Sequence, residues 1–459
     1  TLAMRNICCF LLVLFHGSFN DALWRICKLS KRNIKLCQSG SSSELYIPNR
    51  NSSGSWDNYK LPTSATNSFR NTLLTSSVSI SAAFPAYAAS IAEIGSQKTI
   101  ASASTIQDDR FAYLGGGKTK SEFEPLKISR IINGMWQVSG AHGYSPVAAD
   151  AIEKMSYFAN EGFTTFDLAD IYGPAEDYVG AFRRGRLASS ISQQCQYLTK
   201  WVPRPADINR RIASEAIGRS LDRMKTDRLD LLQFHWWDYS NLNYYIAVDE
   251  LMHLQQDHKI LQLGLTNFDS KHMVDLIEQG APIVSNQVSF SVLDTRPLQR
   301  MVPACQQHGV QLLCYGTLLG GFLSDYWLGK PDPSVNSPSN NSGSIALNNV
   351  SLRKYLPWIG RWGGWELFQE LLRALRTVAI KHGVSISNVA LRWVLDQQAV
   401  GGVIVGIRLG LTEHLQDNQR VYSLRLDAED LETIAAVQRK GRDLMQILGD
   451  CGDEYRRRT

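Results

Sequence analysis

The chain has 459 residues, of which 44% are hydrophobic and 20% are charged, as in globular proteins with a large buried core. The excess behind its net charge of +5 lies in residues 1–105, which hold ten Lys/Arg and four Asp/Glu, whereas the remaining residues hold 38 basic and 39 acidic side chains. Because the body has no cationic excess to neutralise phosphates, we expect no nucleic-acid partner and no membrane partner.

Residues 1–105 are interpreted as a targeting presequence and disordered linker. Residues 38–105 are rich in Ser, Ala, Thr and Asn, poor in acids, and without a helical or strand period, which is typical of an organelle transit peptide. We expect a chloroplast destination. Residues 8–15 resemble the apolar core of a secretory signal, so mitochondrial and secretory sorting stay open.

Residues 106–127 are interpreted as a linker into the body. They contain a Gly-Gly-Gly-Lys-Thr stretch that ends like a phosphate-binding loop. Ala112 stands where such a loop requires a glycine, so this stretch does not predict a phosphate site.

The body holds four scattered cysteines, Cys195, Cys305, Cys314 and Cys451. They form no CxxC pair and have no metal-ligand spacing, so we expect reduced, buried thiols and no metal. No assembly partner is predicted, and we expect a monomer or a weak homo-oligomer.

From residue 128 onward, short apolar runs alternate with stretches that carry apolar residues at helical spacing. Eight runs are predicted strands: 130–136, 163–168, 196–202, 229–236, 260–268, 282–290, 310–318 and 402–407. Helices are predicted between them, for example over 149–160, 208–224 and 365–382. Strands separated by helices pair in parallel, and eight such units favour an α/β fold of the closed (β/α)8 type, a TIM barrel, over 128–450.

The connection after the seventh predicted strand, 322–360, is long and rich in Ser, Asn, Pro and Gly. A loop of that length is usually a lid, a binding loop or a disordered insert. Since barrel active sites form on the loops that follow the strands, we expect this loop insertion near the mouth of the barrel.

Four polar residues fall at or just after the carboxyl ends of three consecutive predicted strands. Asp167 ends the second strand, and Tyr172 follows it in the loop. Lys200 lies near the end of the third strand, and His235 near the end of the fourth. Barrel geometry brings these ends to one rim, so the four side chains are expected to converge. Each of them alone is as often structural as functional.

With these residues in place, the chain resembles the aldo/keto reductase family over roughly residues 125–445. That family carries an Asp-x-Ala-x-x-Tyr-Gly signature and an Asp-Tyr-Lys-His tetrad. The signature is matched by Asp167, Ala169, Tyr172 and Gly173, and the rest of the tetrad by Lys200 and His235. The resemblance implies a (β/α)8 barrel that reduces an aldehyde or ketone with NADPH.

Tyr172 is the expected general acid of this reaction. Hydride arriving at a carbonyl carbon leaves an alkoxide-like oxygen that must be stabilised and protonated. A free tyrosine has a pKa of about 10, and an ammonium at Lys200, held by Asp167, is expected to lower it. His235 is expected to donate or orient a hydrogen bond at the substrate oxygen.

The resemblance also implies an NADPH that lies extended along the mouth of the barrel. Thr266 and Asn267 match the family's Ser-Asn pair that holds the nicotinamide carboxamide, and Gln287 matches the third amide contact. Tyr315 matches the aromatic residue that stacks on the nicotinamide. The pyrophosphate would follow the next three residues, which are Gly316, Thr317 and Leu318.

The last predicted cofactor segment runs from Gly406 to Asn418 and resembles the family's 2′-phosphate and adenine loop. Arg408 could grip the phosphate, and Asp417 with Asn418 could meet the adenine amine. The spacing between Arg408 and Asn418 is longer than the family's pattern, which leaves open which side chain meets the phosphate and whether NADPH is preferred to NADH.

Two other functions stay open. One is a catalytically weak, NADPH-binding regulatory subunit of the same fold, whose mark would be tight NADPH binding with negligible turnover. The other is a barrel hydrolase or isomerase that uses Asp167 and His235, which an absence of nicotinamide binding would favour.

Overall fold

The computed structural model describes residues 48–50, 56–58, 108–140, 143, 146–185, 189–204, 208–334, 347, 350–410 and 414–456. The chain divides into two units, Thr1–Gln107 and Asp108–Thr459. In the first unit, Pro48–Arg50 (β1) pairs antiparallel with Trp56–Asn58 (β2). The rest of the expected presequence and the middle of the 322–360 loop lie outside the described residues.

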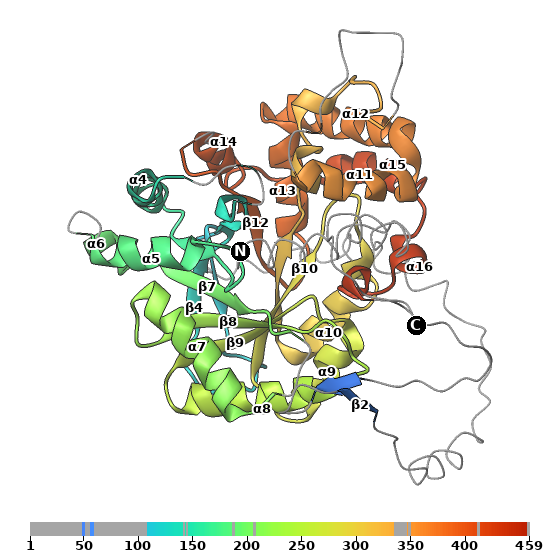
Figure 1. Ribbon diagram of the computed structural model, residues 1–459. Coiled ribbons are helices and arrows are strands. Elements are labelled where there is room, and N and C mark those ends of the chain that lie inside the picture. The colour runs from blue at the N-terminus through green and yellow to red at the C-terminus, as the bar shows by residue number, and fades with distance from the viewer. Residues whose placement is uncertain are drawn as a thin grey trace, which may run out of the picture. The chain divides into compact units, whose positions relative to one another are not determined.

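The second unit is built on a closed barrel of eight parallel strands (Figure 1). The strands are Ile131–Gly134 (β5), Thr165–Asp167 (β6), Gln196–Trp201 (β7), Leu229–His235 (β8), Ile260–Thr266 (β9), Ile283–Ser289 (β10), Gln311–Tyr315 (β11) and Val400–Gly406 (β12). Pairing follows chain order, and β12 pairs with β5 to close the ring. Every predicted strand overlaps one of these strands, so the predicted (β/α)8 barrel is confirmed.

Helices surround the barrel and connect its strands (Figure 1). They are Ala148–Asn160 (α4), Ala175–Arg184 (α5), Ser189–Ser192 (α6), Arg210–Met224 (α7), Asn243–Gln256 (α8), Ser270–Glu278 (α9), Met301–His308 (α10), Val350–Trp362 (α11), Gly364–His382 (α12), Ile386–Leu395 (α13), Leu415–Arg420 (α14), Ala428–Gln438 (α15) and Leu444–Leu448 (α16). Parallel strands require such crossovers, and the apolar face of each crossover helix buries the outside of the barrel. Within the described part of the chain, no helix has both the length and the apolar character of a membrane span.

A β-hairpin closes the amino end of the barrel. It pairs Phe111–Leu114 (β3) with Leu126–Ser129 (β4) in antiparallel register, within and just after the segment that the sequence suggested was a linker. The hairpin's inner side chains, Leu114, Leu126 and Ile128, form one buried cluster with side chains from the barrel strands, such as Leu198 and Leu231. The short apolar runs were overlooked because a glycine-rich turn separates them. The hairpin leaves only the carboxyl end of the barrel open.

The described parts of the 322–360 connection have more regular structure than its composition suggested. After the 3₁₀ turns Leu319–Gly321 (η3) and Asp325–Trp327 (η4), the chain forms α11. The buried positions of α11 include Leu352, Tyr355, Ile359 and Trp362, which recur every three or four residues. This period persists although Pro357 lies inside the helix, so the expectation of an irregular loop was wrong over this part. Figure 1 shows α11, α12 and α15 grouped together beside the barrel.

Candidate active site

The structure brings the predicted polar residues together at the open end of the barrel. Asp167 is the last residue of β6, Lys200 lies one residue before the end of β7, and His235 is the last residue of β8. Strand register places Lys200 opposite Gln233, and His235 opposite Thr266. Because the strands are parallel, their carboxyl ends form one rim, and we call this rim the mouth.

A buried ion pair lies at the centre of the mouth. The ammonium of Lys200 donates to Oδ2 of Asp167 at 2.6 Å and to the carbonyl of Leu168 at 2.7 Å. The two side chains are only 5% and 4% exposed. Burial lowers the pKa of Lys200, although the charge of Asp167 and the hydrogen bond to it act to raise it. Because the two charges are paired and hydrogen-bonded, their interaction offsets much of the free-energy cost of burying them.

The other oxygen of Asp167 is held by two amides. Gln233 donates to Oδ1 at 3.0 Å and Gln287 at 2.7 Å, and Gln287 also donates to Oε1 of Gln233 at 2.7 Å. Sequence reasoning missed Gln233. The signal was present, because Gln233 lies two positions before His235 in β8 and therefore on the same inner face.

Tyr172 lies beside this ion pair, in the loop between β6 and α5. Its ring centroid is 4.8 Å from Nζ of Lys200. The loop is tight at Gly173, which has a φ of 55° and lies so close to the carbonyl of Ser139 that a Cβ would be 2.9 Å from its oxygen. The expected nearness of the phenol and the ammonium is therefore present in the structure.

The expected lowering of the Tyr172 pKa was wrong. Burial raises the pKa of Tyr172 well above its usual value, and the carboxylate of Asp167 raises it further. The main physical reason is burial, which disfavours the charged phenolate. In addition, Asp167 neutralises Lys200 at 2.6 Å, so the phenol faces an ion pair instead of a bare cation. Tyr172 keeps its proton at neutral pH.

His235 is a neutral imidazole with one free acceptor. Its Nδ1 lies 3.1 Å from the carbonyl of Thr266, and because a carbonyl only accepts, Nδ1 is the protonated nitrogen. Burial, followed by the charge of Arg456, lowers the pKa of His235 to about 3. Nε2 is buried without a partner among the described residues. In this state Nε2 can accept a hydrogen bond but cannot donate one, so of the two expected roles, donating or orienting a hydrogen bond, only the orienting role fits this ring state.

The residues predicted to hold a nicotinamide also lie at the mouth, with one difference. Thr266 ends β9, and the hydroxyl of Tyr315, at the end of β11, donates to Oδ1 of Asn267 at 2.8 Å. The amide nitrogen of Gln287, by contrast, is engaged with Asp167 and Gln233. Gln287 therefore supports the ion pair, and its amide hydrogens are not free for a ligand.

The predicted pyrophosphate residues form a tight turn after β11. Gly316 has a φ of 71°, and a Cβ there would lie 2.4 Å from the hydroxyl of Tyr355. The hydroxyl of Thr317 is buried and has no partner among the described residues. Leu318 follows and enters η3. The unpartnered Thr317 hydroxyl and His235 Nε2 fit a polar ligand bound along the mouth.

The far end of the predicted cofactor segment is only partly as expected. Gly406 ends β12, and Arg408 is half-buried without an ion pair among the described residues. Asp417 does not lie free, because Oδ2 accepts from the hydroxyl of Ser385 at 2.9 Å at the start of α13. Asn418 is buried in α14.

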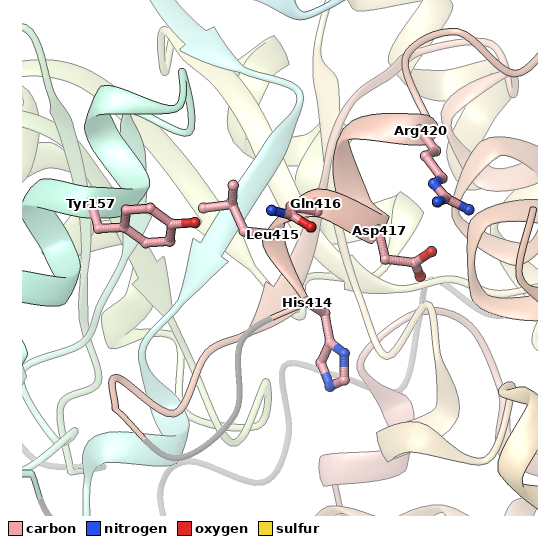
Figure 2. A pocket seen from close by; sticks show the side chains of 6 residues that line it. All are labelled: Tyr157, His414, Leu415, Gln416, Asp417 and Arg420. Carbon is pink, nitrogen blue, oxygen red and sulfur yellow. The ribbon is translucent and has the colours of Figure 1, made fainter.

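A polar pocket of about 440 Å³ lies between α4 and α14 (Figure 2). Its lining residues are Tyr157, His414, Leu415, Gln416, Asp417 and Arg420. Arg408 and Asn418 are not among them. Arg420 is therefore a second cation near the predicted phosphate end, and sequence reasoning missed it because the resemblance pointed only to Arg408.

The end of the chain also reaches the mouth, which the sequence did not predict. The 3₁₀ turn Asp453–Tyr455 (η5) places the hydroxyl of Tyr455 2.9 Å from that of Tyr315. Arg456 donates to the carbonyl of Asn267 at 2.6 Å and to that of Trp236 at 2.9 Å. The contacts with Asn267 and Tyr315 join residues more than 100 positions apart, and no local sequence pattern reveals such pairs.

Asp170, between Asp167 and Tyr172, gives a prediction about stability. Burial raises the pKa of Asp170 to about 7, while its oxygens accept from the amide of Val202 at 3.3 Å. Between about pH 4 and pH 7 the folded chain keeps this carboxyl protonated and the unfolded chain ionises it. The free energy of unfolding therefore falls as the pH rises through this window.

We expect Asp170→Asn to remove this loss. As the pH rises from 4 to 8, the free energy of unfolding of the variant should increase by about 1–4 kcal/mol relative to that of the wild type. Urea denaturation at the two pH values measures this change. An equal difference between the two proteins at both pH values would contradict the raised pKa.

Two further features bear on the chemistry. The cysteines Cys195, Cys305, Cys314 and Cys451 are free and buried, and burial raises their pKa values, to about 12 for Cys195. Such thiols are poor nucleophiles. Within the described ranges, no group of three His, Cys, Asp or Glu side chains could hold a metal ion.

Comparison with known proteins points to one family. The model of the aldo/keto reductase family matches residues 130–439. Flagellar radial spoke protein 5 of Chlamydomonas reinhardtii is 32% identical over 189 residues, which cover 37% of this chain and only a third (33%) of that protein. The chloroplastic pyridoxal reductase of Arabidopsis thaliana is 24% identical over 71% of this chain and 88% of its own length.

A solved structure shares the fold. The glycerol dehydrogenase of Gluconobacter oxydans matches with a TM-score of 0.55 and 24% identity, over 73% of this chain and 97% of its own. This likeness supports the barrel architecture and says nothing of the substrate.

Proposed function

Because the chain belongs to the aldo/keto reductase family, we propose that this oxidoreductase uses NADPH to reduce an aldehyde or ketone to an alcohol. The observation that carries the proposal is the position of Tyr172 at the mouth, with its ring centroid 4.8 Å from the ammonium of Lys200. A proton donor beside a stabilising charge is the arrangement that reduction of a carbonyl requires.

In the proposed reaction, bound NADPH supplies the hydride. Tyr172 donates its phenolic proton to the oxygen of the carbonyl as negative charge develops there. The raised pKa of Tyr172 suits this role, because the phenol is fully protonated when the substrate arrives and a developing alkoxide is a stronger base. Lys200 then stabilises the phenolate, while Asp167 keeps the ammonium in position.

His235 has a positioning role in this proposal. Its free acceptor, Nε2, can receive a hydrogen bond from the hydroxyl of Tyr172 or of the alcohol product. It cannot donate to the substrate carbonyl while Nδ1 holds the proton. The neutral ring also avoids a second positive charge beside Lys200, in line with its lowered pKa.

The residues that would hold the cofactor line the same rim. Thr266, Asn267 and Tyr315 would face the nicotinamide, and Gly316, Thr317 and Leu318 the pyrophosphate. Gly406, Arg408, Asp417 and Asn418 would face the adenosine end. The unpartnered hydroxyl of Thr317 supports this assignment.

The direct test is a fluorescence titration of the full chain with NADPH and NADH, followed by a panel of aldehydes and ketones. We expect saturable NADPH binding, and NADPH oxidation with small reactive aldehydes. Absence of any nicotinamide binding would reject the proposal and favour a barrel hydrolase or isomerase.

A second candidate is a catalytically weak regulatory subunit that binds NADPH. Tight NADPH binding with negligible turnover on the whole panel would support this candidate.

Arg408 gives a prediction about the choice of cofactor. A charge-assisted hydrogen bond to the 2′-phosphate contributes about 1.5–3 kcal/mol, so Arg408→Ala should raise the Kd of NADPH about 10- to 100-fold and leave that of NADH unchanged. Arg420→Ala is the matched comparison. If Arg420→Ala weakens NADPH binding instead, the phosphate lies at the pocket of Figure 2.

We also propose a chloroplast destination, supported by the composition of residues 38–105 and by the chloroplastic relative. A fusion of residues 1–107 to a fluorescent protein should enter chloroplasts. Accumulation in mitochondria or the secretory pathway would reject this destination.

A further inference from the structure

One side chain at the mouth, Lys354 of α11, forms no ion pair with a carboxylate among the residues that the structure describes. The nearest acidic influence is Glu454, which is itself paired with Arg296. Its ammonium donates a hydrogen bond of 2.6 Å to the hydroxyl of Tyr455. It also lies 5.0–5.8 Å from the centroids of four aromatic rings, which belong to Trp136, Tyr315, Tyr355 and Tyr455. Lys354 therefore sits in an aromatic cage.

This cage keeps the ammonium charged. Burial acts to lower the pKa of Lys354, but the phenols of Tyr355 and Tyr455, the hydrogen bond to Tyr455 and the charge of Glu454 raise it above the ordinary lysine value. A neutral phenol engages only one of the three donors of an ammonium, and aromatic faces attract a cation less strongly than an anion does. Lys200 shows the contrast at the same mouth, because Asp167 pairs with it.

The cage faces the space that the proposed function assigns to a ligand. The ammonium of Lys354 lies 5.0 Å from the ring centroid of Tyr315, the residue proposed to face the nicotinamide. The hydroxyl of Tyr455 bridges Lys354 and Tyr315. A ligand at Tyr315 would therefore meet both Lys354 and Tyr455.

Resting on that function, we propose that Lys354 is a further ligand-binding residue of the mouth, which exchanges the Tyr455 hydroxyl for an anionic group, phosphate or carboxylate, of the bound ligand. The anion comes either from the nicotinamide nucleotide or from the carbonyl substrate. The hydroxyl of Tyr455 holds the place that this anion would take.

The test uses both partners of the Lys354–Tyr455 hydrogen bond. Lys354→Met removes the cation and should weaken binding of the anionic ligand about 10- to 100-fold. Tyr455→Phe removes the competing hydroxyl and should strengthen the same binding by about 2- to 10-fold. A merely structural pair would shift binding in one direction for both variants, so opposite signs identify the exchange.

Two measurements distinguish the sources of the anion. The first is the Kd of NADPH by fluorescence titration. The second is the KM, at saturating NADPH, of an aldehyde that carries a carboxylate, compared with its neutral analogue. If Lys354→Met and Tyr455→Phe shift the Kd of NADPH in opposite directions, the anion belongs to the nucleotide. If they shift only the KM of the carboxylated aldehyde in opposite directions, the anion belongs to the substrate.

Two further variants serve as controls. Lys354→Arg keeps the charge and should retain most of the binding. Lys127→Met removes a lysine that lies over the ring of Phe111 in the hairpin, at the other end of the barrel, and should change neither measurement. A melting curve of each variant verifies that it is folded.

The inference is overturned if the wild type binds NADPH and Lys354→Met changes neither constant, or if both variants shift binding in the same direction. Failure of the proposed function looks different, because the wild type itself then binds no nicotinamide nucleotide, and the inference falls with it.

Discussion

Tyr172→Phe is expected to lower kcat for carbonyl reduction by about 10²- to 10⁴-fold, the contribution typical of a positioned general acid. The substitution removes only the hydroxyl, and the ring remains to pack beside Lys200. Because the proposed role of Tyr172 is confined to proton transfer, the Kd of NADPH should stay within about twofold of the wild type. Steady-state kinetics and fluorescence titration of the same preparation measure the two constants.

The matched control is Tyr113→Phe, in the hairpin at the amino end of the barrel, where the side chain is 50% exposed. It should leave both kcat and Kd unchanged. Equal activity in Tyr172→Phe and the wild type would remove Tyr172 from the reaction, and a Kd raised as much as kcat is lowered would assign it to binding.

The barrel could be predicted from the sequence because its strands are short apolar runs separated by helical periods. In β8, for example, every position except Asp230 is buried, as expected for a parallel strand that is covered on both faces. Short apolar runs, together with the helical spacing between them, leave one architecture that fits eight repeats.

The convergence of Asp167, Tyr172, Lys200 and His235 could be predicted for a related reason. Parallel strands all end at the same rim, so a position at a strand end fixes a position in space. The roles of the four residues do not follow from placement alone, and they stay predictions until the variants are measured.

The electrostatic state of the site could not be predicted from the same residues. The sequence predicts that Asp167 holds the ammonium of Lys200, but not that the carboxylate, at 2.6 Å, offsets the charge of Lys200 at the phenol. Likewise, Gln287 could be placed at a strand end, yet its engagement with Gln233 depends on a fit of side chains inside the barrel. These outcomes depend on distances below 3 Å, which a pattern does not contain.

The contacts made by residues 452–456 could not be predicted from the sequence either. The turn at Tyr455 and the contact of Arg456 with Asn267 have no local signature. Gly452 approaches so closely that a Cβ would lie 2.0 Å from the carbonyl of Asn267, which is a requirement of the folded structure only. Such contacts are set by tertiary packing and correspond to no local pattern in the sequence.

The strongest expected effect on stability follows from Arg296, which anchors the end of the chain. Its guanidinium donates to both oxygens of Asp294, at 2.8 and 3.0 Å, and to Glu454 at 2.9 Å. The three side chains are 1%, 0% and 6% exposed. Arg296→Met leaves two buried carboxylates without their cation, which should cost about 3–5 kcal/mol in free energy of unfolding, measured by urea denaturation.

The pH dependence of this loss separates charge from packing. In the wild type, the charge of Arg296 and the hydrogen bond to it lower the pKa of Glu454 against the effect of burial. Without Arg296, the effect of burial on Glu454 loses its main opposing charge and raises the folded pKa of this carboxyl, so the variant loses stability as the pH rises through that pKa. The difference from the wild type should therefore be smaller at pH 4 than at pH 7. A loss that is the same at both pH values would assign the effect to the shape of the side chain.

The matched control is Arg211→Met, which breaks an exposed ion pair. The side chains of Arg211 and Glu215 are 72% and 52% exposed. This variant should change the free energy of unfolding by no more than about 0.5 kcal/mol at either pH.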